Sequence, residues 1–170
     1  PPVRPGVPGY LAIDLGASRL AAGIVDQNGE VVLRDRVATP ARNVWPVLTQ
    51  LVGRVLAANP GDVEPQMCGV TCPGPMWHGF PIRRELSAIT GLEVEMETPG
   101  RALALAELWR GDAAEQPAGS TCFATMVLGD DGDGGFVVRG GLVNGVTGNL
   151  GQFGHLIVEP DGMPCACGAA

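Results

Sequence analysis

Three short apolar segments near the start of the chain are the sequence feature that most restricts its fold. They occupy residues 10–14, 19–26 and 30–38, and short turns separate them. The second turn, residues 26–29 (DQNG), is typical of a β-hairpin, because Asn-Gly readily adopts the left-handed backbone that tight hairpins need. Consecutive strands joined by short turns usually lie side by side. The sequence therefore predicts an antiparallel meander that begins a sheet.

Helices and strands are expected to alternate after this meander. Apolar residues spaced by three and four predict a helix at 41–58, and the Asn-Pro-Gly that follows is a strong stop signal. The further elements expected are a strand at 66–72, a helix at 82–90, a strand at 92–97, a helix at 99–109 and paired strands at 119–129 and 134–139. This order predicts an α/β fold, with helices packed on a mixed sheet.

The 170 residues suffice for one ordinary domain or for two small lobes. Proline and glycine dominate residues 1–9, which we expect to form a mobile leader. A first lobe is expected at 10–118 and the start of a second at 119–170, because the loop GDAAEQPAG interrupts the pattern of elements. The chain begins with Pro rather than Met, which favours a processed or cut piece of a longer protein.

The charged residues exclude several classes of protein. All eleven basic residues are arginine, and a chain without lysine lacks the residue required by P-loop NTPases, Schiff-base enzymes and protein kinases. The net charge of −7 argues against direct binding to nucleic acid or to an anionic membrane.

The apolar runs and the cysteines indicate a cytoplasmic protein. No apolar run approaches the roughly 18 residues of a membrane span, and residues 1–9 lack the apolar segment of a signal peptide. Five cysteines without a secretory signal are typical of cytosolic thiols or metal ligands rather than of a disulfide framework.

Five separate motifs carry a resemblance to a known family. They are LAIDLGASRLAAGIVDQNG, GVTCPGP, GLEVEMETPGRALALAELWRG, VLGDDGDGGFVVRGGLVNGVTGNLGQFGHLIVEPDG and CACG. In this order they resemble the ROK family of sugar kinases and sugar-responsive repressors, from Tyr10 to Gly168. The resemblance covers only the front part of a family member. It implies the actin-like ATPase (ribonuclease H-like) fold, with a first lobe and the opening of a second.

The resemblance implies that the turn after the first strand contacts a nucleotide. In the family, the residue matching Asp14 helps to hold Mg²⁺, and the turn from Gly16 to Ser18 meets phosphate. Such chemistry is sound, because turn N–H groups can bind an anion and a carboxylate suits Mg²⁺. Ala17 replaces the usual second glycine and narrows the approach of a phosphate. A plain β-hairpin with a solvated aspartate is the alternative interpretation.

The loop GDDGDGG stands where the family has its glycine-rich phosphate loop. Gly132 and Gly134 keep the backbone freedom of that loop, whereas Asp130, Asp131 and Asp133 add charge that repels a triphosphate unless a metal intervenes. The three acids also resemble a loose Ca²⁺ loop without its closing Glu. A solvated hairpin turn is the favoured interpretation.

The stretch Glu97-Thr98-Pro99 replaces the family's Glu-Asn-Asp, in which Asn contacts the sugar and Asp is the general base. Pro99 has no titratable group. Glu97 lies two residues upstream, about 6.5 Å away along a strand, and a base needs hydrogen-bond reach of about 3 Å. A helix cap at Thr98 followed by proline at the first helical position explains both residues without catalysis.

Other expected sugar contacts are Gln152 and His155 in GQFGH, which resembles the family's Gly-Glu-x-Gly-His. Gln152 keeps a hydrogen-bond acceptor but loses the charge of the family's Glu. Together with Glu97 and Thr98 these residues form the expected sugar-binding set. Trp77 and His78 lie in a shortened loop, where they either contact a sugar or close over the core.

His155, Cys165 and Cys167 match the family's structural zinc site in type and spacing. Histidine nitrogen and thiolate sulfur are good Zn²⁺ ligands, and such sites stabilise small loops. The family's remaining cysteine would follow residue 170, so the fourth ligand would come from water, from another chain or from Cys68, Cys72 or Cys122. Two free thiols on a frayed tail are the alternative.

These features together indicate a non-catalytic, sugar-kinase-like protein that senses a sugar or mediates an interaction. The first alternative is an ATP- and Mg²⁺-dependent kinase of a hexose or N-acetylhexosamine, active only with a missing half or a substitute base. A second is a fragment of a repressor, whose DNA-binding helix-turn-helix would belong to a longer chain. A third is a truncated product that folds as a homodimer covering its exposed strands.

Overall fold

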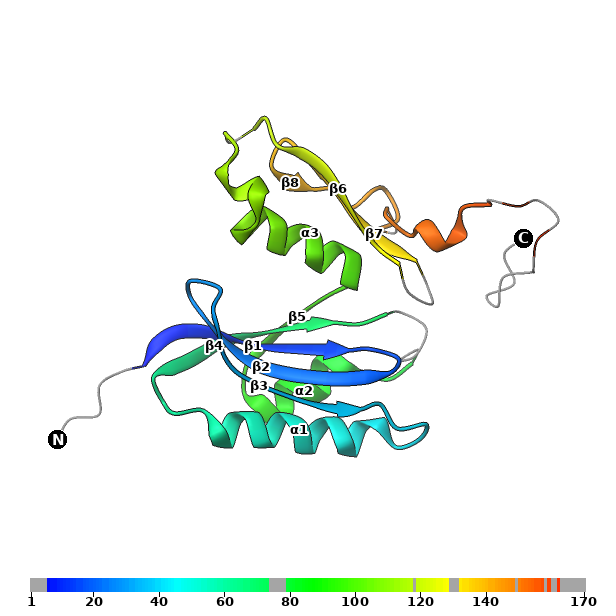
Figure 1. The fold of residues 1–170 in the computed structure, drawn as a ribbon. Helices are drawn as coiled ribbons and strands as arrows, with labels where there is room; N and C mark the ends of the chain where they lie inside the picture. The colour runs from blue at the N-terminus through cyan, green and yellow to red at the C-terminus, as the bar shows by residue number, and fades with distance from the viewer. Residues whose placement is uncertain are drawn as a thin grey trace. The chain divides into compact units, whose positions relative to one another are not determined.

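The computed structural model describes most of the chain as two compact units. The described residues are 6–73, 79–117, 119–128, 132–148, 150–157, 159 and 162. Unit 1 is Pro1–Glu97 and unit 2 is Thr98–Ala170 (Figure 1). The division lies after Glu97 rather than after residue 118, because the helix that follows Glu97 packs against the strands of unit 2.

Unit 1 is built on a five-stranded mixed sheet in the order β3-β2-β1-β4-β5. The strands are β1 (Val7–Leu15), β2 (Arg19–Asp26), β3 (Val31–Ala38), β4 (Val63–Thr71) and β5 (Glu93–Glu97). The first three form the expected antiparallel meander, while β4 pairs with β1 and β5 with β4 in parallel. The expected leader at 1–9 is wrong in part, because β1 already begins at Val7, whose N–H donates to the carbonyl of Asp62 at 2.7 Å.

Two helices cover one face of this sheet. They are α1 (Val44–Ala58) and α2 (Ile82–Thr90), and both lie on the same side in Figure 1. The helix expected at 41–58 begins later, because Asn43 has a left-handed backbone with φ 56°. The core lies between helices and sheet, and its fully buried members include Leu11, Leu15, Leu20, Leu51 and Leu86.

Unit 2 is a helix packed on a three-stranded antiparallel sheet in the order β6-β7-β8. Its elements are α3 (Pro99–Arg110), β6 (Cys122–Val127), β7 (Asp133–Val138), β8 (Gly141–Leu142) and two 3-10 turns, Asp112–Glu115 and Phe153–His155. Thr98 holds the N-cap position and Pro99 the first helical position, as expected, but the Thr98 side chain makes no capping hydrogen bond. Among the described residues, no helix has the length and apolar character that crossing a membrane requires.

Candidate functional site

Asp14, Thr71 and Glu97 form a row across three neighbouring strands of unit 1. In the parallel register, Asp14 pairs with Thr71 and Thr71 with Glu97. Thr71 Oγ1 donates a hydrogen bond to Asp14 Oδ1 at 2.6 Å, and this orients the exposed carboxylate. The row lies at the carboxyl ends of the parallel strands, where open α/β sheets bind their ligands. Asp14 is therefore well placed to contact a ligand or metal.

The turn from Gly16 to Ser18 follows Asp14 directly and is held by Thr39. Thr39 Oγ1 donates to the carbonyl of Gly16 at 2.7 Å, and Thr39 N–H donates to the carbonyl of Ser18 at 3.1 Å. A Cβ at position 16 would lie 2.7 Å from the carbonyl oxygen of Arg19, so this turn requires glycine. Ala17 and Ser18 are exposed. The turn is a fixed, open surface beside a carboxylate.

Glu97 stays in the regular ladder of β5 to its last residue. Its backbone carbonyl accepts a hydrogen bond from Cys72 N–H at 3.0 Å, and Glu97 pairs with Thr71 in the parallel register. Strand β5 is therefore regular up to its last residue, and the Glu97 backbone does not occupy the position of Pro99. The distance expected along the strand, about 6.5 Å for two residues, remains.

The start of α3 is fastened to β7 by a carboxylate. Gly100 N–H donates to Asp133 Oδ2 at 2.6 Å, which places a negative charge at the positive end of the helix. Asp133 was expected to be solvated in a hairpin turn, but it serves instead as a cap from a distant segment. Asp130 and Asp131 lie outside the described residues.

Glycines allow three segments of unit 2 to pack at backbone distance. A Cβ on Gly100 would overlap Gly134 Cα, and a Cβ on Gly134 would overlap the ring of Phe153. A Cβ on Gly151 would overlap the carbonyl of Gly134. The start of α3 and the segment beginning at Gly151 thus both lie against the start of β7, and buried Gly134 has a packing role there.

The remaining expected residues of unit 2 lie near these backbone contacts between α3, β7 and the segment beginning at Gly151. Gly132 has φ 53°, and its carbonyl accepts a hydrogen bond from Gly154 N–H at 2.7 Å. Gln152 and His155 are exposed on either side of that contact. Thr98, two residues before Gly100, has a buried Oγ1 without a hydrogen-bond partner among the described residues. The glycine contacts therefore bring the Thr98 end of α3 and the 152–155 segment to one part of unit 2.

Two polar residues that connect α3 to the strands and loops of unit 2 were not predicted from the sequence. Thr125 is buried, donates from Oγ1 to the carbonyl of Gly100 at 2.7 Å and accepts from Gly135 N–H at 3.2 Å. Arg101 is also buried, and its guanidinium donates to the carbonyl of Val143 at 3.1 Å and to Asn144 Oδ1. Neither contact has a local sequence signal, because the partners are 10 to 43 residues away.

The expected zinc ligands lie mostly outside the structure that can be described. Cys165 and Cys167 are not among the described residues, and His155 is exposed. Within the described ranges, no three His, Cys, Asp or Glu side chains are grouped as a metal site. Of the other candidate ligands, Cys68 and Cys72 are buried in the core of unit 1, as small apolar residues would be, and Cys122 is exposed.

The shortened loop with Trp77 and His78 also lies outside the described residues. Just after it, Phe80 packs on Trp45 with ring centroids 5.1 Å apart.

Burial raises the pKa of the Cys68 thiol to about 12 and that of Cys72 to about 11. Folding therefore favours the protonated form of both thiols. Their contribution to the free energy of unfolding is fully present below the ordinary thiol pKa, and it is lost as the pH rises through about 11 to 12. At pH 8 their thiolate fraction is about 0.1% or less, and thiolates are the reactive form.

We expect iodoacetamide to label exposed Cys122 much faster than Cys68 or Cys72, as measured by peptide mass spectrometry. Equal labelling rates in the folded protein would contradict the buried placement.

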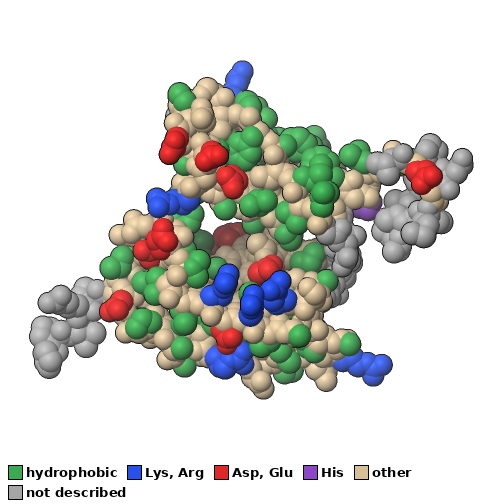
Figure 2. All heavy atoms as spheres, in the orientation of Figure 1, with side chains coloured by type: hydrophobic (Ala, Val, Ile, Leu, Met, Phe, Trp, Pro, Cys, Tyr) green, Lys and Arg blue, Asp and Glu red, His purple; other side chains and the backbone are tan. Residues whose placement is uncertain are grey.

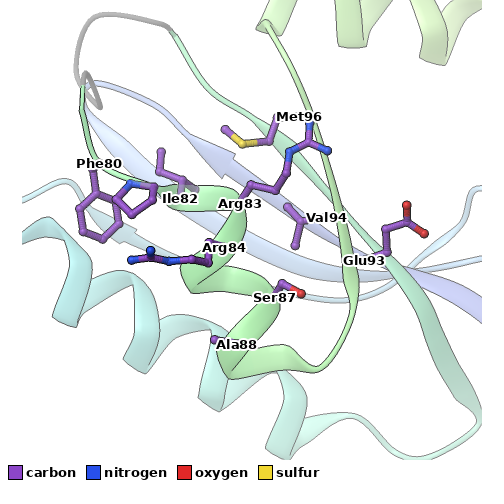
Figure 3. A pocket seen from close by; sticks show the side chains of 10 residues that line it. Phe80, Ile82, Arg83, Arg84, Ser87, Ala88, Glu93, Val94 and Met96 are labelled. Carbon is purple, nitrogen blue, oxygen red and sulfur yellow. The ribbon is translucent and has the colours of Figure 1, made fainter.

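A hollow of about 850 Å³ lies between α2 and β5. Figure 3 shows Phe80, Ile82, Val94 and Met96 at this hollow, with Arg83 and Arg84 projecting from α2. None of the residues expected to bind nucleotide or sugar lines it.

Comparison with known proteins gives a consistent set of relatives. The family model of the ROK family matches residues 10–170. A glucokinase of Thermotoga maritima is 28% identical over 176 residues, which covers 93% of this chain and 53% of the relative. The ROK family glucokinase of Streptomyces griseus, solved with glucose and AMPPNP, has a TM-score of 0.77 and 25% identity, and the match covers 94% of this chain and 54% of that one. The ROK hexokinase of Thermus thermophilus has a TM-score of 0.74 and 30% identity, and the match covers 94% of this chain and 56% of that one. The chain thus spans about half the length of these relatives.

Proposed function

The chain belongs to the ROK family and has its actin-like α/β fold, and from this premise we propose that it is a sugar-binding module without kinase activity. In this role it senses a sugar or presents the sugar-bound form to a partner. One solved relative with this fold, the glucokinase of Streptomyces griseus, holds glucose and AMPPNP, which supports a sugar ligand for this fold.

The observation that carries the proposal is the absence of a general base at position 99. Pro99 is the first residue of α3, where the family's base would stand, and its ring neither accepts a proton nor carries an N–H. The backbone of Glu97 is held in the β5 ladder by the hydrogen bond from Cys72 N–H. Its Cα lies two residues upstream, about 6.5 Å along the chain from that of residue 99, so the Glu97 carboxylate does not start from the backbone position of the family's base.

The polar groups near the start of α3 support sugar binding. Thr98 Oγ1 is buried without a partner among the described residues, and an unsatisfied buried hydroxyl costs about 1–3 kcal/mol. A sugar hydroxyl would satisfy it. Gln152 and His155 are exposed on the segment that packs against the same part of β7. Their side chains supply acceptors and donors of the kind that bind sugar hydroxyls.

A second candidate function is an ATP-dependent kinase of a hexose or N-acetylhexosamine. The observation that favours it is the arrangement at the end of β1, where Thr71 orients the Asp14 carboxylate and Thr39 holds the Gly16–Ser18 turn. Asp14 would hold Mg²⁺, and the Gly16–Ser18 turn would meet a phosphate. Because the chain spans about half of its relatives, this activity requires the remaining half or another acid as base.

The decisive experiment measures binding and turnover on the same sample. We expect isothermal titration calorimetry to detect binding of glucose or N-acetylglucosamine, and an ADP-release assay with the same sugars to stay at background. Asp14→Ala is the matched control, because it removes the Mg²⁺ ligand without touching the sugar-binding set. ADP release that depends on sugar and disappears in Asp14→Ala would show that the protein is a kinase.

A further inference from the structure

The sheet face of unit 1 that α1 and α2 do not cover carries opposite charges along its two edges. Paired residues of neighbouring strands lie on the same face, so the register arranges this face as three rows across the five strands. From β3 to β5 the rows are Val31, Val25, Tyr10, Met67 and Glu93; Arg34, Gly23, Ala12, Gly69 and Glu95; and Arg36, Ala21, Asp14, Thr71 and Glu97. The β3 edge is thus basic and the β5 edge acidic. Figure 2 shows blue basic and red acidic side chains on the surface of unit 1.

The middle of this face is flat, and its first row is apolar. Gly23, Ala12 and Gly69 occupy the three inner positions of the second row, so another surface can approach the backbone closely there. Tyr10 and Val31 of the first row are 41% and 59% exposed, and their apolar surface would be stabilised by removal from water. A flat sheet face of this kind packs well against a second sheet about 10 Å away.

The charges of the two edges remain available to a partner. The edges lie four strand spacings apart, about 19 Å, which is more than twice the Debye length of about 8 Å, so they do not neutralise each other within one copy. Arg83 of α2 donates to Glu95 at 3.3 Å, but these side chains are 55% and 56% exposed, and exposed ion pairs are weak. Asp35, between the two arginines of β3, points to the opposite face and pairs with Arg54 at 2.8 Å.

We propose that this face binds a second copy of the chain, with the two sheets packed face to face. A two-fold axis along β1, the central strand, places the basic edge of each copy over the acidic edge of the other. A two-fold axis across the strands would place arginine over arginine, so the charges favour the first arrangement. Aligned sheets cross at about 30°, and the glutamates present in all three rows keep an acid opposite Arg34 and Arg36 at that angle.

Asp14 lies on the central strand and therefore faces its own copy in this dimer. Asp14 pairs with Ala21, and Arg19 is two residues from Ala21, so Arg19 and Asp14 are diagonal neighbours on the same face. Two carboxylates and two guanidinium groups thus meet near the axis, and their charges sum to zero. The dimer covers Asp14, so it agrees better with the sugar-binding module proposed above than with the kinase alternative.

The size of the face sets the expected strength of the dimer. Five strands about 4.8 Å apart, with rows that span about six residues, form a face of roughly 500 Å². Two such faces bury roughly 1,000 Å², which is the lower limit for a specific interface. We therefore expect a weak dimer, with a dissociation constant of about 1–100 μM.

Sedimentation velocity at roughly 5 to 500 μM protein and physiological ionic strength tests this interface. We expect the parent chain to change from monomer to dimer across this range. The variants Arg34→Glu/Arg36→Glu and Glu93→Arg/Glu95→Arg should each dimerise at least about tenfold more weakly, because opposite charges are replaced by like charges in every edge contact. Mixing the two variants should restore a dimer, because one then has two acidic edges and the other two basic edges.

The matched control is Arg42→Glu/Arg84→Glu, which changes the net charge as much as the arginine variant does, on exposed side chains before α1 and in α2. It should change the dissociation constant less than about threefold, because neither residue lies on the proposed interface. Equal losses in the control and in Arg34→Glu/Arg36→Glu, or a mixture that stays monomeric, would overturn the proposal. A parent chain that is monomeric throughout would also overturn it, and the face would then be left for another protein or a further segment to cover.

Discussion

Gly151→Ala is expected to lower the melting temperature of unit 2 by at least about 10 °C. Gly151 has φ 109°, and an added Cβ would overlap the carbonyl of Gly134. Overpacking costs about 1–3 kcal/mol and a left-handed backbone with a side chain about 1–2 kcal/mol. Each kcal/mol lowers the melting temperature of a unit of this size by about 4–8 °C. Thermal unfolding followed by circular dichroism measures the effect.

Gly148→Ala is the matched control for that experiment. Gly148 lies in the same connection, with φ 76°, but a Cβ there would meet nothing within 4 Å. Its substitution therefore carries the backbone strain without the overlap, and we expect less than half of the shift. Equal shifts in both variants would mean that the contact between Gly151 and Gly134 does not hold the three segments together.

Local patterns in the sequence predicted most elements of unit 1. The helix Ile82–Thr90 was predicted with its observed bounds, because its apolar spacing and the following Gly91 are local signals, and Gly91 is left-handed at φ 71°. The DQNG turn between β2 and β3 was predicted because its geometry depends on four adjacent residues. The first strand was predicted too short, because the proline and glycine at 8 and 9 hid its pairing with β4.

The parts of the site that depend on distant partners could not be read from the sequence. Thr71 lies 57 residues from Asp14, and their hydrogen bond depends on the parallel register of β1 and β4. Asp133 looked like a solvated loop acid because nothing local reveals that Gly100 N–H points at it. These long-range contacts also explain why α3 belongs to unit 2, although the sequence suggested a boundary after residue 118.

The glycines of the GDDGDGG loop show how one sequence signal can have two physical causes. Glycine is needed where a backbone approaches a phosphate, and equally where two backbones approach each other. In unit 2 the second cause is visible, because Gly134 touches Gly100, Gly151 and Phe153. A role in phosphate binding for Gly132 and Gly134 therefore remains a proposal, and the packing role is the observed one.

Replacing Thr98 with Asn and Pro99 with Asp is expected to raise the affinity for glucose or N-acetylglucosamine by about 10- to 100-fold. The pair restores the side chains that the family has at these positions. A hydrogen bond to a charged group contributes about 1.5–3 kcal/mol, and each 1.4 kcal/mol is tenfold in affinity. Asn is a favoured N-cap, and Asp is favourable at the start of a helix, so α3 should persist. Isothermal titration calorimetry with each sugar measures the gain.

Pro99→Ala separates the two causes that such a gain could have. It removes the proline ring without adding a hydrogen-bonding group, so it should leave the affinity within about twofold of the parent, well below the tenfold that one charged hydrogen bond contributes. A gain in the double variant alone would assign residues 98 and 99 to the sugar site and make the lost carboxylate the reason for weak binding. If neither variant changes the affinity, the start of α3 does not contact the sugar. The functional interpretation of Thr98 and its buried Oγ1 would then be wrong.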